Sequence, residues 1–277
     1  MIQLFFPLSL RELWEIRSRF PQSRLFAGGT DLFVQRRYQT QDESPLIGLE
    51  RIQELRTTAW EGDTFTVGAA TPIRQLLEDD SVQTLLPVLA QGLACMGGPA
   101  LRNMATIGGN LCTASPAGDS LPPLYVLGAD VVLHSEFGRR SLPIKEFILG
   151  PGSTSLRCGE ILHSIKISRP PPGSVQWYQK VGQRKANAIA IVSLAVLGRS
   201  APDGGFQSIR LAWGSVGPTV ITSREAEACL ESSPLTMEKV NSAAQTARQA
   251  VAPIDDIRAS AEYRRMLSGN LVYRLLR

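Results

Sequence analysis

The sequence has few cysteines and no long apolar run, and these absences exclude several classes of protein. Its four cysteines, Cys95, Cys112, Cys158 and Cys229, lie far apart without any C-x-x-C pair, which argues against a zinc site or a local iron–sulfur cluster. No apolar stretch approaches the ~20 residues of a membrane-spanning helix. The N-terminal segment MIQLFFPLSLRELWEI lacks the basic start of a signal peptide. We therefore expect a cytoplasmic protein with reduced thiols and no membrane span.

Charge is not concentrated in any part of the chain either. The 277 residues carry a formal net charge of +4, and the basic residues occur singly or in pairs such as Arg36-Arg37 and Arg139-Arg140. No basic run interleaves with aromatic residues, so the charge does not indicate nucleic-acid binding. A mildly basic surface suits acidic partner subunits or an anionic cofactor. The length suits two or three compact lobes.

Alternating helical and strand-like segments predict an α+β protein. Ser9 to Glu12 fits a capping box that begins a helix ending before Pro21. A short strand, Arg24 to Ala27, then leads through a glycine-rich turn into a helix over 32–38. Thr71 is expected to cap the next helix. Further helices are expected at 73–80, 85–97, 237–251 and 260–277, and strands at 45–52, 63–70, 129–136, 161–168, 174–182 and 208–216, with the apolar run 188–198 buried. Pro170 to Gly173 is the clearest linker.

The first glycine-rich turn is Ala27-Gly28-Gly29-Thr30-Asp31. Glycine permits positive φ and close approach of the backbone, so successive N–H groups can converge on a phosphate or pyrophosphate. Thr30 could add a hydroxyl donor, and Asp31 could cap the following helix or accept from a ribose hydroxyl. Such short patterns are common, and taken alone this one is more often a tight turn without a ligand. It matches neither the Rossmann nor the P-loop pattern.

A second glycine-rich stretch covers residues 97–119 and is longer. It contains Arg102-Asn103-Met104-Ala105-Thr106-Ile107-Gly108-Gly109-Asn110 and Thr113-Ala114-Ser115-Pro116-Ala117-Gly118-Asp119, in which small residues, amides and hydroxyls dominate. We expect such a stretch to build no core and to need partners for its backbone polar groups. A bound polar cofactor would supply them. The alternative is an unusually long surface Ω-loop.

With both loops considered, the sequence resembles the FAD-binding (medium) subunits of the xanthine dehydrogenase and carbon monoxide dehydrogenase family, the molybdenum hydroxylases. The family's first flavin loop, A-G-G-x-x-L, is matched by Ala27 to Leu32. Its second, R-N-x-A-T-I-G-G-N-x-x-x-A-S-P-x-x-D, is matched almost completely by Arg102 to Asp119. Further similar segments extend the resemblance over essentially the whole chain, at 67–71, 160–167, 178–184, 213–230 and 255–274.

This resemblance implies a fold and a division of the chain. Residues 1–172 would form a two-lobed FAD-binding domain of the vanillyl-alcohol-oxidase or PCMH-like type, with sub-lobes of about 1–57 and 58–172. Residues 173–277 would form a smaller α+β C-terminal domain of the CO dehydrogenase flavoprotein type. His134 and His163 lie outside both loops, so the FAD is expected to be bound non-covalently.

The resemblance also implies which residues bind FAD. The pyrophosphate and ribityl path would be lined by Leu25, Ala27, Gly28, Gly29, Thr30, Asp31 and Leu32. The path around the diphosphate and towards the flavin would be lined by Ala105, Thr106, Gly109, Asn110, Thr113, Gly118 and Asp119. Leu162 would pack near the flavin or adenine, and Lys180 would lie near the pyrimidine edge of the flavin. An alternative for Lys180 is a surface lysine lying over an aromatic neighbour. No catalytic side chain and no metal ligand is expected.

The family implies a division of labour among subunits. A large partner would hold the molybdenum cofactor, a small partner would hold 2Fe–2S clusters, and this subunit would pass electrons through FAD to NAD or another acceptor. The chain lacks the cysteine-rich insertion that some family members carry, so FAD would be its only redox group. Two alternatives are a stand-alone FAD-dependent oxidoreductase, which would work without partners, and a flavin-free assembly or scaffold subunit.

Overall fold

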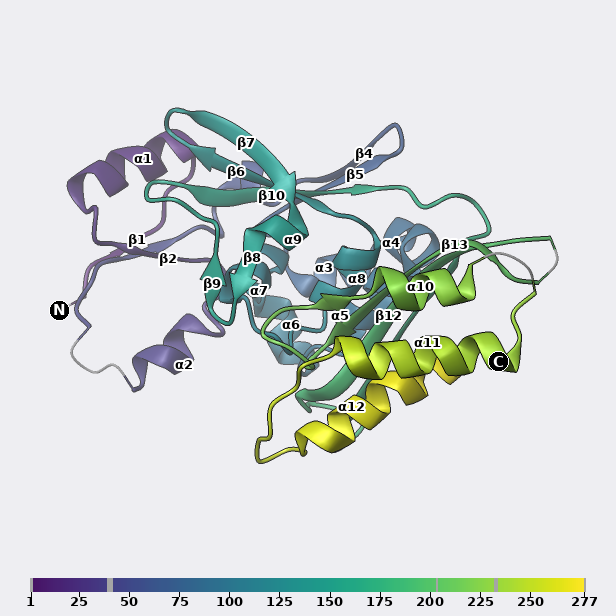
Figure 1. Ribbon diagram of the computed structural model, residues 1–277. Helices are drawn as coiled ribbons and strands as arrows, with labels where there is room; N and C mark the ends of the chain where they lie inside the picture. Colours follow the sequence, from purple (N-terminus) through teal and green to yellow (C-terminus); the bar gives the residue numbers. More distant parts are fainter. Residues whose placement is uncertain (1, 39–41, 203, 232–233, 277) are drawn as a thin grey trace.

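The computed structural model describes residues 2–38, 42–202, 204–231 and 234–276. Within these residues the strands form three larger sheets, one after another along the chain, and a two-stranded one. In Figure 1 the N-terminal lobe lies on the left, the second sheet at the top centre and the C-terminal sheet on the right, with α11 and α12 along its outer side. The predicted α+β class is confirmed, because helices cover faces of these sheets.

The N-terminal lobe is a small parallel sheet with the strand order β1-β3-β2. Ser9 Oγ accepts the Glu12 N–H and caps the first helix as predicted, but the Glu12 carboxylate accepts from the Leu8 N–H and not from Ser9. The helix buries Leu10 and Leu13 against the sheet. The elements are β1 (Leu4–Phe5), α1 (Leu10–Arg19), β2 (Arg24–Phe26), α2 (Leu32–Arg36), β3 (Leu46–Gly48) and η1 (Gln53–Leu55).

The second sheet is antiparallel, with the strand order β4-β5-β10-β6-β7. Its core is the largest of the chain and includes Phe65, Ile165 and Phe147. The strands are β4 (Thr58–Glu61), β5 (Thr64–Gly68), β6 (Asp130–Ser135), β7 (Gly138–Pro143) and β10 (Ile161–Ser168), with β8 (Ile148–Gly150) and β9 (Ser153–Thr154) as the two-stranded sheet.

Seven short helices lie between these strands in the sequence. Two predictions for them are wrong. Thr71 does not cap α3: Pro72 occupies the N-cap position, and the Thr71 hydroxyl is buried without a hydrogen-bond partner. Residues 97–119 do contribute to a core, because they contain two helices, the second of which, α7, buries Ile107 and Leu111. The helices are α3 (Ile73–Leu77), α4 (Asp80–Leu85), α5 (Pro87–Ala94), α6 (Pro99–Met104), α7 (Ile107–Thr113), α8 (Leu121–Val126) and α9 (Ile144–Phe147).

The C-terminal sheet is an antiparallel meander with helices on its outer face. The apolar run 188–198 is buried over 190–196, which lies in the central strand β12, whereas Ile189 before the strand is 51 % exposed, so the expected burial is wrong at that end. Trp213 is fully buried and donates its indole N–H to the Ser268 carbonyl at 3.0 Å. The elements are β11 (Val175–Gly182), β12 (Ala190–Ser200), β13 (Phe206–Gly214), β14 (Ile221–Thr222), α10 (Arg224–Leu230), α11 (Met237–Ala250), α12 (Ala261–Asn270) and η2 (Leu271–Leu276).

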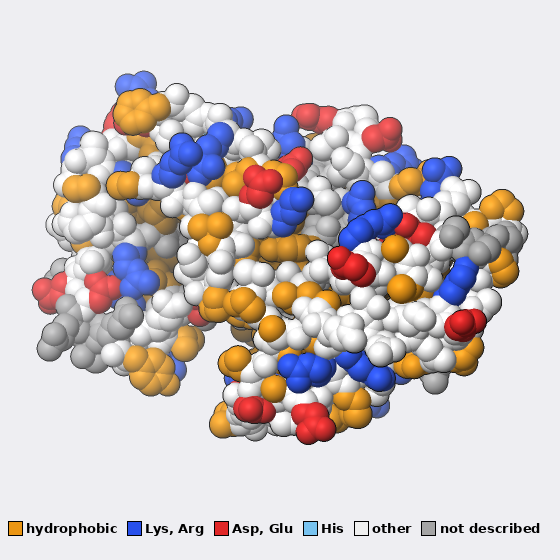
Figure 2. All heavy atoms as spheres, in the orientation of Figure 1, with side chains coloured by type: hydrophobic (Ala, Val, Ile, Leu, Met, Phe, Trp, Pro, Cys, Tyr) orange, Lys and Arg blue, Asp and Glu red, His pale blue; other side chains and the backbone are white. Residues whose placement is uncertain are grey.

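The inner face of this sheet packs on the helices of the preceding part of the chain. Tyr178, Ala195 and Ala212 belong to the same apolar cluster as α5 and α8. On the face shown in Figure 2, positive and negative side chains are interspersed, without one large basic field. In the part of the chain that the structure describes, no helix is both long and apolar enough to span a bilayer.

Candidate functional site

The two glycine-rich loops lie directly against each other. A Cβ atom placed on Gly28 would lie 1.7 Å from the carbonyl oxygen of Met104 and 3.0 Å from the backbone nitrogen of Ala105. Only a glycine at position 28 therefore lets the first loop approach the second this closely. The Asp31 carboxylate accepts a hydrogen bond from Thr113 Oγ1 at 3.0 Å, across 82 positions of sequence. The structure thus brings the two predicted sets of residues together.

Asp31 does not cap α2, although it occupies the N-cap position. Its side chain makes no capping hydrogen bond, because the carboxylate accepts from Thr113 and, at 2.8 Å, from the Gln35 side-chain amide. Of the two roles predicted for Asp31, the capping of α2 is therefore wrong, and acceptance from a ribose hydroxyl stays a prediction. The reason lies in the tertiary structure, because the Thr113 hydroxyl of α7 donates to the carboxylate that would otherwise cap α2.

The first loop offers a run of unpaired backbone donors. Within the described residues, the N–H groups of residues 28–32 donate to no protein acceptor. Gly29 has a φ of +67°, the left-handed conformation that, next to right-handed residues, turns successive N–H groups towards one side of the chain. A buried or half-buried N–H group needs a partner. Such a run suits an anionic group with several acceptor oxygens, as in a pyrophosphate.

The second loop differs, because the protein itself occupies the donors at the start of α7. The Ile107 N–H donates to the Thr71 carbonyl at 3.1 Å and the Gly108 N–H to the Ala69 carbonyl at 2.8 Å. The Gly109 N–H donates to Thr106 Oγ1 at 3.1 Å. The expectation that this whole stretch needs a ligand to satisfy its backbone is therefore wrong for its central residues.

Adjacent glycines in the second loop have different surroundings. A Cβ on Gly108 would lie 2.5–2.8 Å from atoms of Ala69, including backbone atoms, so packing against Ala69, which directly follows β5, requires a glycine there. A Cβ on Gly109 would meet only the hydroxyl of Thr106, at 2.9 Å, and Gly109 is exposed. No backbone atom excludes a side chain at 109, but a Cβ there would displace the Thr106 hydroxyl that caps α7. The close approach of a ligand would be a further reason for the glycine.

The other predicted residues described here, in this loop and at Leu162 of β10, have hydrogen-bond partners within the protein or lie in the core. Ser120 Oγ donates to the Asn110 side-chain oxygen at 2.6 Å, and the Ala105 and Thr106 side chains are buried. Gly118 lies in a tight turn in which its N–H donates to the Ser115 carbonyl. Leu162 is 4 % exposed and its side chain packs in the core of the second sheet.

Asp119 and Lys180 form a buried ion pair between the end of the second loop and β11. Lys180 Nζ lies 2.6 Å from Asp119 Oδ2, and their side chains are 11 % and 8 % exposed. Tyr178 donates its hydroxyl to the other carboxylate oxygen at 2.7 Å, and Lys180 also donates to the Cys95 carbonyl at 3.0 Å. Burial raises the pKa of Asp119, while Lys180 and Tyr178 oppose that rise. Lys180 is therefore not a surface lysine, and its charge is largely offset by Asp119.

Tyr178 is a site residue that sequence reasoning missed. It lies two positions before Lys180 on the same strand, so both side chains point to the same face of the sheet. Burial, followed by the charge of Asp119, raises the pKa of Tyr178 well above its ordinary value, so the phenol stays protonated as a donor. The spacing of two residues between Tyr178 and Lys180 in a predicted strand could have indicated that both side chains lie on one face.

A hollow of about 400 Å³ borders the end of the second loop. Ser115, Pro116 and Ala117 line one side, and residues of the C-terminal part line the other, among them Ser215 and Arg264. The Ser215 N–H donates to the Pro116 carbonyl at 2.9 Å and joins the two sides. The Arg264 guanidinium is 4 % exposed and bonds the carbonyls of Ile191 and Ser215 and the Asp256 carboxylate.

The chain matches two protein-family descriptions in succession. Residues 1–170 match the FAD binding domain in molybdopterin dehydrogenase, and residues 177–277 match the CO dehydrogenase flavoprotein C-terminal domain. The two matched segments meet at the proline-rich segment after β10. Together they account for nearly the whole chain.

Individual relatives and solved structures agree with these matches. The xanthine dehydrogenase FAD-binding subunit of Escherichia coli O157:H7 is 34 % identical over 88 % of this chain and 84 % of its own length. A carbon monoxide dehydrogenase structure from Hydrogenophaga pseudoflava matches with a TM-score of 0.93 and 30 % identity, covering 99 % of this chain and 96 % of that chain. Quinoline 2-oxidoreductase from Pseudomonas putida 86 matches with a TM-score of 0.93 and 26 % identity, covering 100 % and 95 %.

Proposed function

Because the chain belongs to the family of FAD-binding subunits of molybdopterin dehydrogenases, we propose that it passes electrons from the 2Fe–2S clusters of a partner subunit through its FAD to NAD or another acceptor. The flavin ring supplies the redox chemistry when it is bound. The residues of this chain bind the cofactor, orient it and shape its surroundings. The observation that carries the proposal is the run of free N–H groups at residues 28–32, beside a second loop that leaves Gly109 open.

The surroundings of the two loops suggest how the cofactor would lie across them. The pyrophosphate would accept from the N–H groups of residues 28–32, because within the described residues these groups donate to no protein acceptor. Thr113 and Asp31 lie side by side and offer a hydroxyl and a carboxylate to the ribityl or ribose hydroxyls. The open side of Gly109 admits the cofactor against the backbone. The hollow beside Ser115, Pro116 and Ala117 gives room for the ring system at the far end.

Lys180 acts in this arrangement as part of a pair. Its ammonium group is held by Asp119 and by the Cys95 carbonyl, and the pair fixes the end of the second loop to β11. Because Asp119 offsets its charge, Lys180 contributes mainly by positioning the loop, and its electrostatic effect on the ring is reduced. We also propose a direct contact between Lys180 and the pyrimidine edge of the flavin. The other FAD contacts predicted from the resemblance, including that of the Leu162 backbone, are proposed as well.

The partners and the division of the chain are proposed on the same basis. The molybdenum cofactor and the 2Fe–2S clusters lie on a large and a small partner subunit, and this chain carries FAD non-covalently as its only redox group. Its parts are an FAD-binding domain over 1–172, with sub-lobes of about 1–57 and 58–172, and a C-terminal domain over 173–277. The three apolar clusters support this division, although Tyr178, Ala195 and Ala212 join the core of the second sheet.

Purification from the native source tests the proposal. The flavin absorption, the bound metals and the co-purifying chains are recorded together. A yellow protein accompanied by molybdenum and iron–sulfur subunits is the expected result. A yellow chain that is active alone indicates a stand-alone oxidoreductase, and a colourless chain indicates a scaffold or assembly subunit. Either of the last two results overturns the proposed function.

A further inference from the structure

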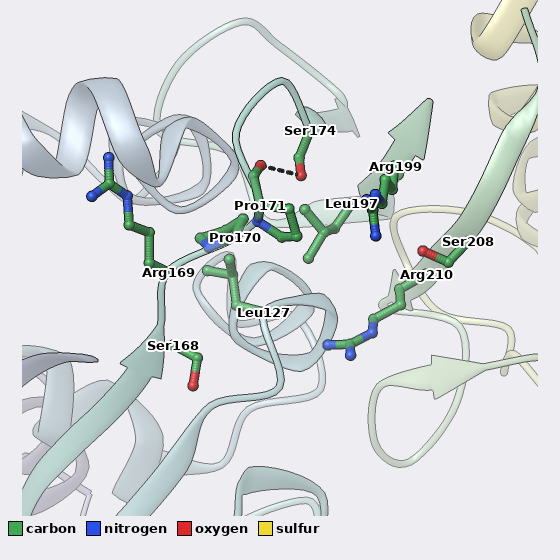
Figure 3. A pocket seen from close by; sticks show the side chains of 11 residues that line it. Leu127, Ser168, Arg169, Pro170, Pro171, Ser174, Leu197, Arg199, Ser208 and Arg210 are labelled. Atoms are coloured by element: carbon green, nitrogen blue, oxygen red, sulfur yellow. Dashed lines mark hydrogen bonds between the residues drawn. The ribbon is translucent and has the colours of Figure 1, made fainter. Parts of the chain in front are cut away.

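A second hollow lies away from both glycine-rich loops, where the segment after β10 meets the C-terminal sheet. Its volume is about 190 Å³. Figure 3 shows its walls: Leu127 beyond the end of α8, Pro170 and Pro171 of the linker, and side chains from β12 and β13. Because one water molecule takes ~30 Å³ in the liquid, the hollow has room for a small ligand with part of its hydration shell.

Two arginines on neighbouring strands, both exposed, line this hollow. The antiparallel register pairs Arg199 with Ser208 and Leu197 with Arg210, so these four side chains share one face of the sheet and the two arginines stand at diagonal positions. In Figure 3 the Arg210 side chain extends from β13 towards Leu127, across the hollow from the linker. Like charges on neighbouring strands repel each other, so a negative partner would stabilise this arrangement.

The described residues supply little negative charge there. No lining residue is acidic, and neither Arg199 nor Arg210 takes part in an ion pair of the described chain. Arg210 donates to the Val126 carbonyl at 3.0 Å. The charge of Glu227 reaches Arg210, but Glu227 also lies 3.7 Å from Arg224. The hollow therefore keeps a net positive charge.

Hydroxyl groups complete the lining. Ser168 and Ser208 border the hollow, and Ser174 donates to the Pro171 carbonyl at 2.6 Å, which holds the turn of the linker. Guanidinium and hydroxyl donors without carboxylates are the set that binds tetrahedral oxyanions. Arg169 also borders the hollow, but its side chain points away from the others in Figure 3. Its guanidinium group is therefore not one of the donors that face the hollow.

We propose that this hollow binds a phosphate-type oxyanion, held by Arg199 and Arg210 with the hydroxyls of Ser168 and Ser208. The bound anion offsets the repulsion between the two guanidinium groups. It also ties β12 and β13 to the segment that follows β10. Because the anion binds only the folded arrangement, it stabilises the joint between the C-terminal sheet and the rest of the chain.

Calorimetric titration with inorganic phosphate tests this site, on the protein as it is purified and with chloride keeping the ionic strength constant. We expect saturable binding and a rise in the thermal midpoint with phosphate concentration. The double variant Arg199→Gln/Arg210→Gln should bind phosphate at least about tenfold more weakly, because it loses both charge-assisted donors. The matched control is Arg74→Gln, which removes an exposed arginine that pairs with Glu78 and does not line the hollow; this variant should bind phosphate as the wild type does.

Two results would overturn the proposal. One is equal phosphate binding by the wild type and the double variant, provided that circular dichroism shows both to be folded. The other is a response to acetate but not to phosphate, which would assign the hollow to a carboxylate of another protein chain. Flavin absorption recorded in the same samples reports separately on the cofactor site, so failure at one site is distinguishable from failure at the other.

Discussion

Replacing Lys180 by methionine should lower the free energy of unfolding by about 3–5 kcal/mol, the usual effect of removing one partner of a buried ion pair. The side chains of Lys180 and Asp119 are 11 % and 8 % exposed, and their charged atoms lie 2.6 Å apart. In the variant the Asp119 carboxylate stays buried with the Tyr178 hydroxyl as its remaining side-chain donor. An exposed ion pair would contribute only about 0–1 kcal/mol.

The loss should depend on pH in a definite direction. Burial already raises the pKa of Asp119, and removal of the Lys180 ammonium group raises it further. A carboxyl group with a raised pKa in the folded state takes up its proton before the unfolded chain does, so the native state gains stability as the pH falls. The difference between wild type and Lys180→Met should therefore shrink from neutral pH towards the ordinary carboxyl range.

Urea unfolding followed by circular dichroism measures this loss at several pH values. In the double variant Asp119→Asn/Lys180→Met the loss should be smaller than the sum of the two single losses, because no charge is left buried. The control is Arg11→Met, which breaks the exposed pair of Arg11 with Glu15 and should leave the unfolding midpoint within experimental error. A loss below about 1 kcal/mol for Lys180→Met, or one that grows as the pH falls, would refute the reasoning.

Contacts of Gly109, His163 and Trp213 give three further predictions. Gly109→Ala should change the stability of the cofactor-free chain by no more than about 1 kcal/mol, because the helix preference of alanine over glycine is opposed by the 2.9 Å approach of its Cβ to the Thr106 hydroxyl. Gly108→Ala should lower stability, because its Cβ meets the Ala69 backbone. Gly109→Val should abolish FAD retention, and unchanged flavin absorption of this variant would mean that the loop assignment is wrong. Burial, with the charge of Arg139, lowers the pKa of His163 from 6.5 to about 4. As the pH drops through this range the unfolded chain takes up the proton first, so the stability of the native state should fall. The unfolding midpoint of His163→Gln should vary less between pH 6.5 and pH 4 than that of the wild type, and an equal dependence on pH would contradict the prediction. Trp213→Ala should cost about 3–5 kcal/mol through the cavity it leaves, measured by urea unfolding, and a loss under about 1 kcal/mol would show that the C-terminal core does not depend on this side chain.

Local features of the fold could be predicted from the sequence, because neighbouring residues decide them. The Ser9 cap, the burial of 190–196 and the helix over 237–251 depend on short-range patterns of hydroxyls and apolar side chains. The cap assigned to Thr71 was wrong because Pro72 takes that position and Thr71 lies buried beneath the second loop. A local sequence pattern does not reveal such packing.

The two glycine-rich loops show the same limit at the candidate site. Their residues alone mark them as unusual, and the length of the second match identifies the family. In the second loop the N–H groups of Ile107 and Gly108 donate to the carbonyls of Thr71 and Ala69, which lie more than thirty positions earlier in the sequence. Such distant contacts decide which loop keeps backbone donors without a protein partner. The sequence therefore pointed to the second loop, whereas tertiary packing leaves the unpaired donors in the first.

What the sequence by itself determined is the family, the α+β class and the two glycine-rich segments proposed to hold the cofactor, since each rests on the order of residues along the chain. Only the tertiary structure decided that Asp31 faces Thr113 and that Asp119 is held by Tyr178 and Lys180. These partners lie 82, 59 and 61 positions apart. The physical reason is that a carboxylate pairs with whichever donor the packing of distant elements brings within hydrogen-bond distance.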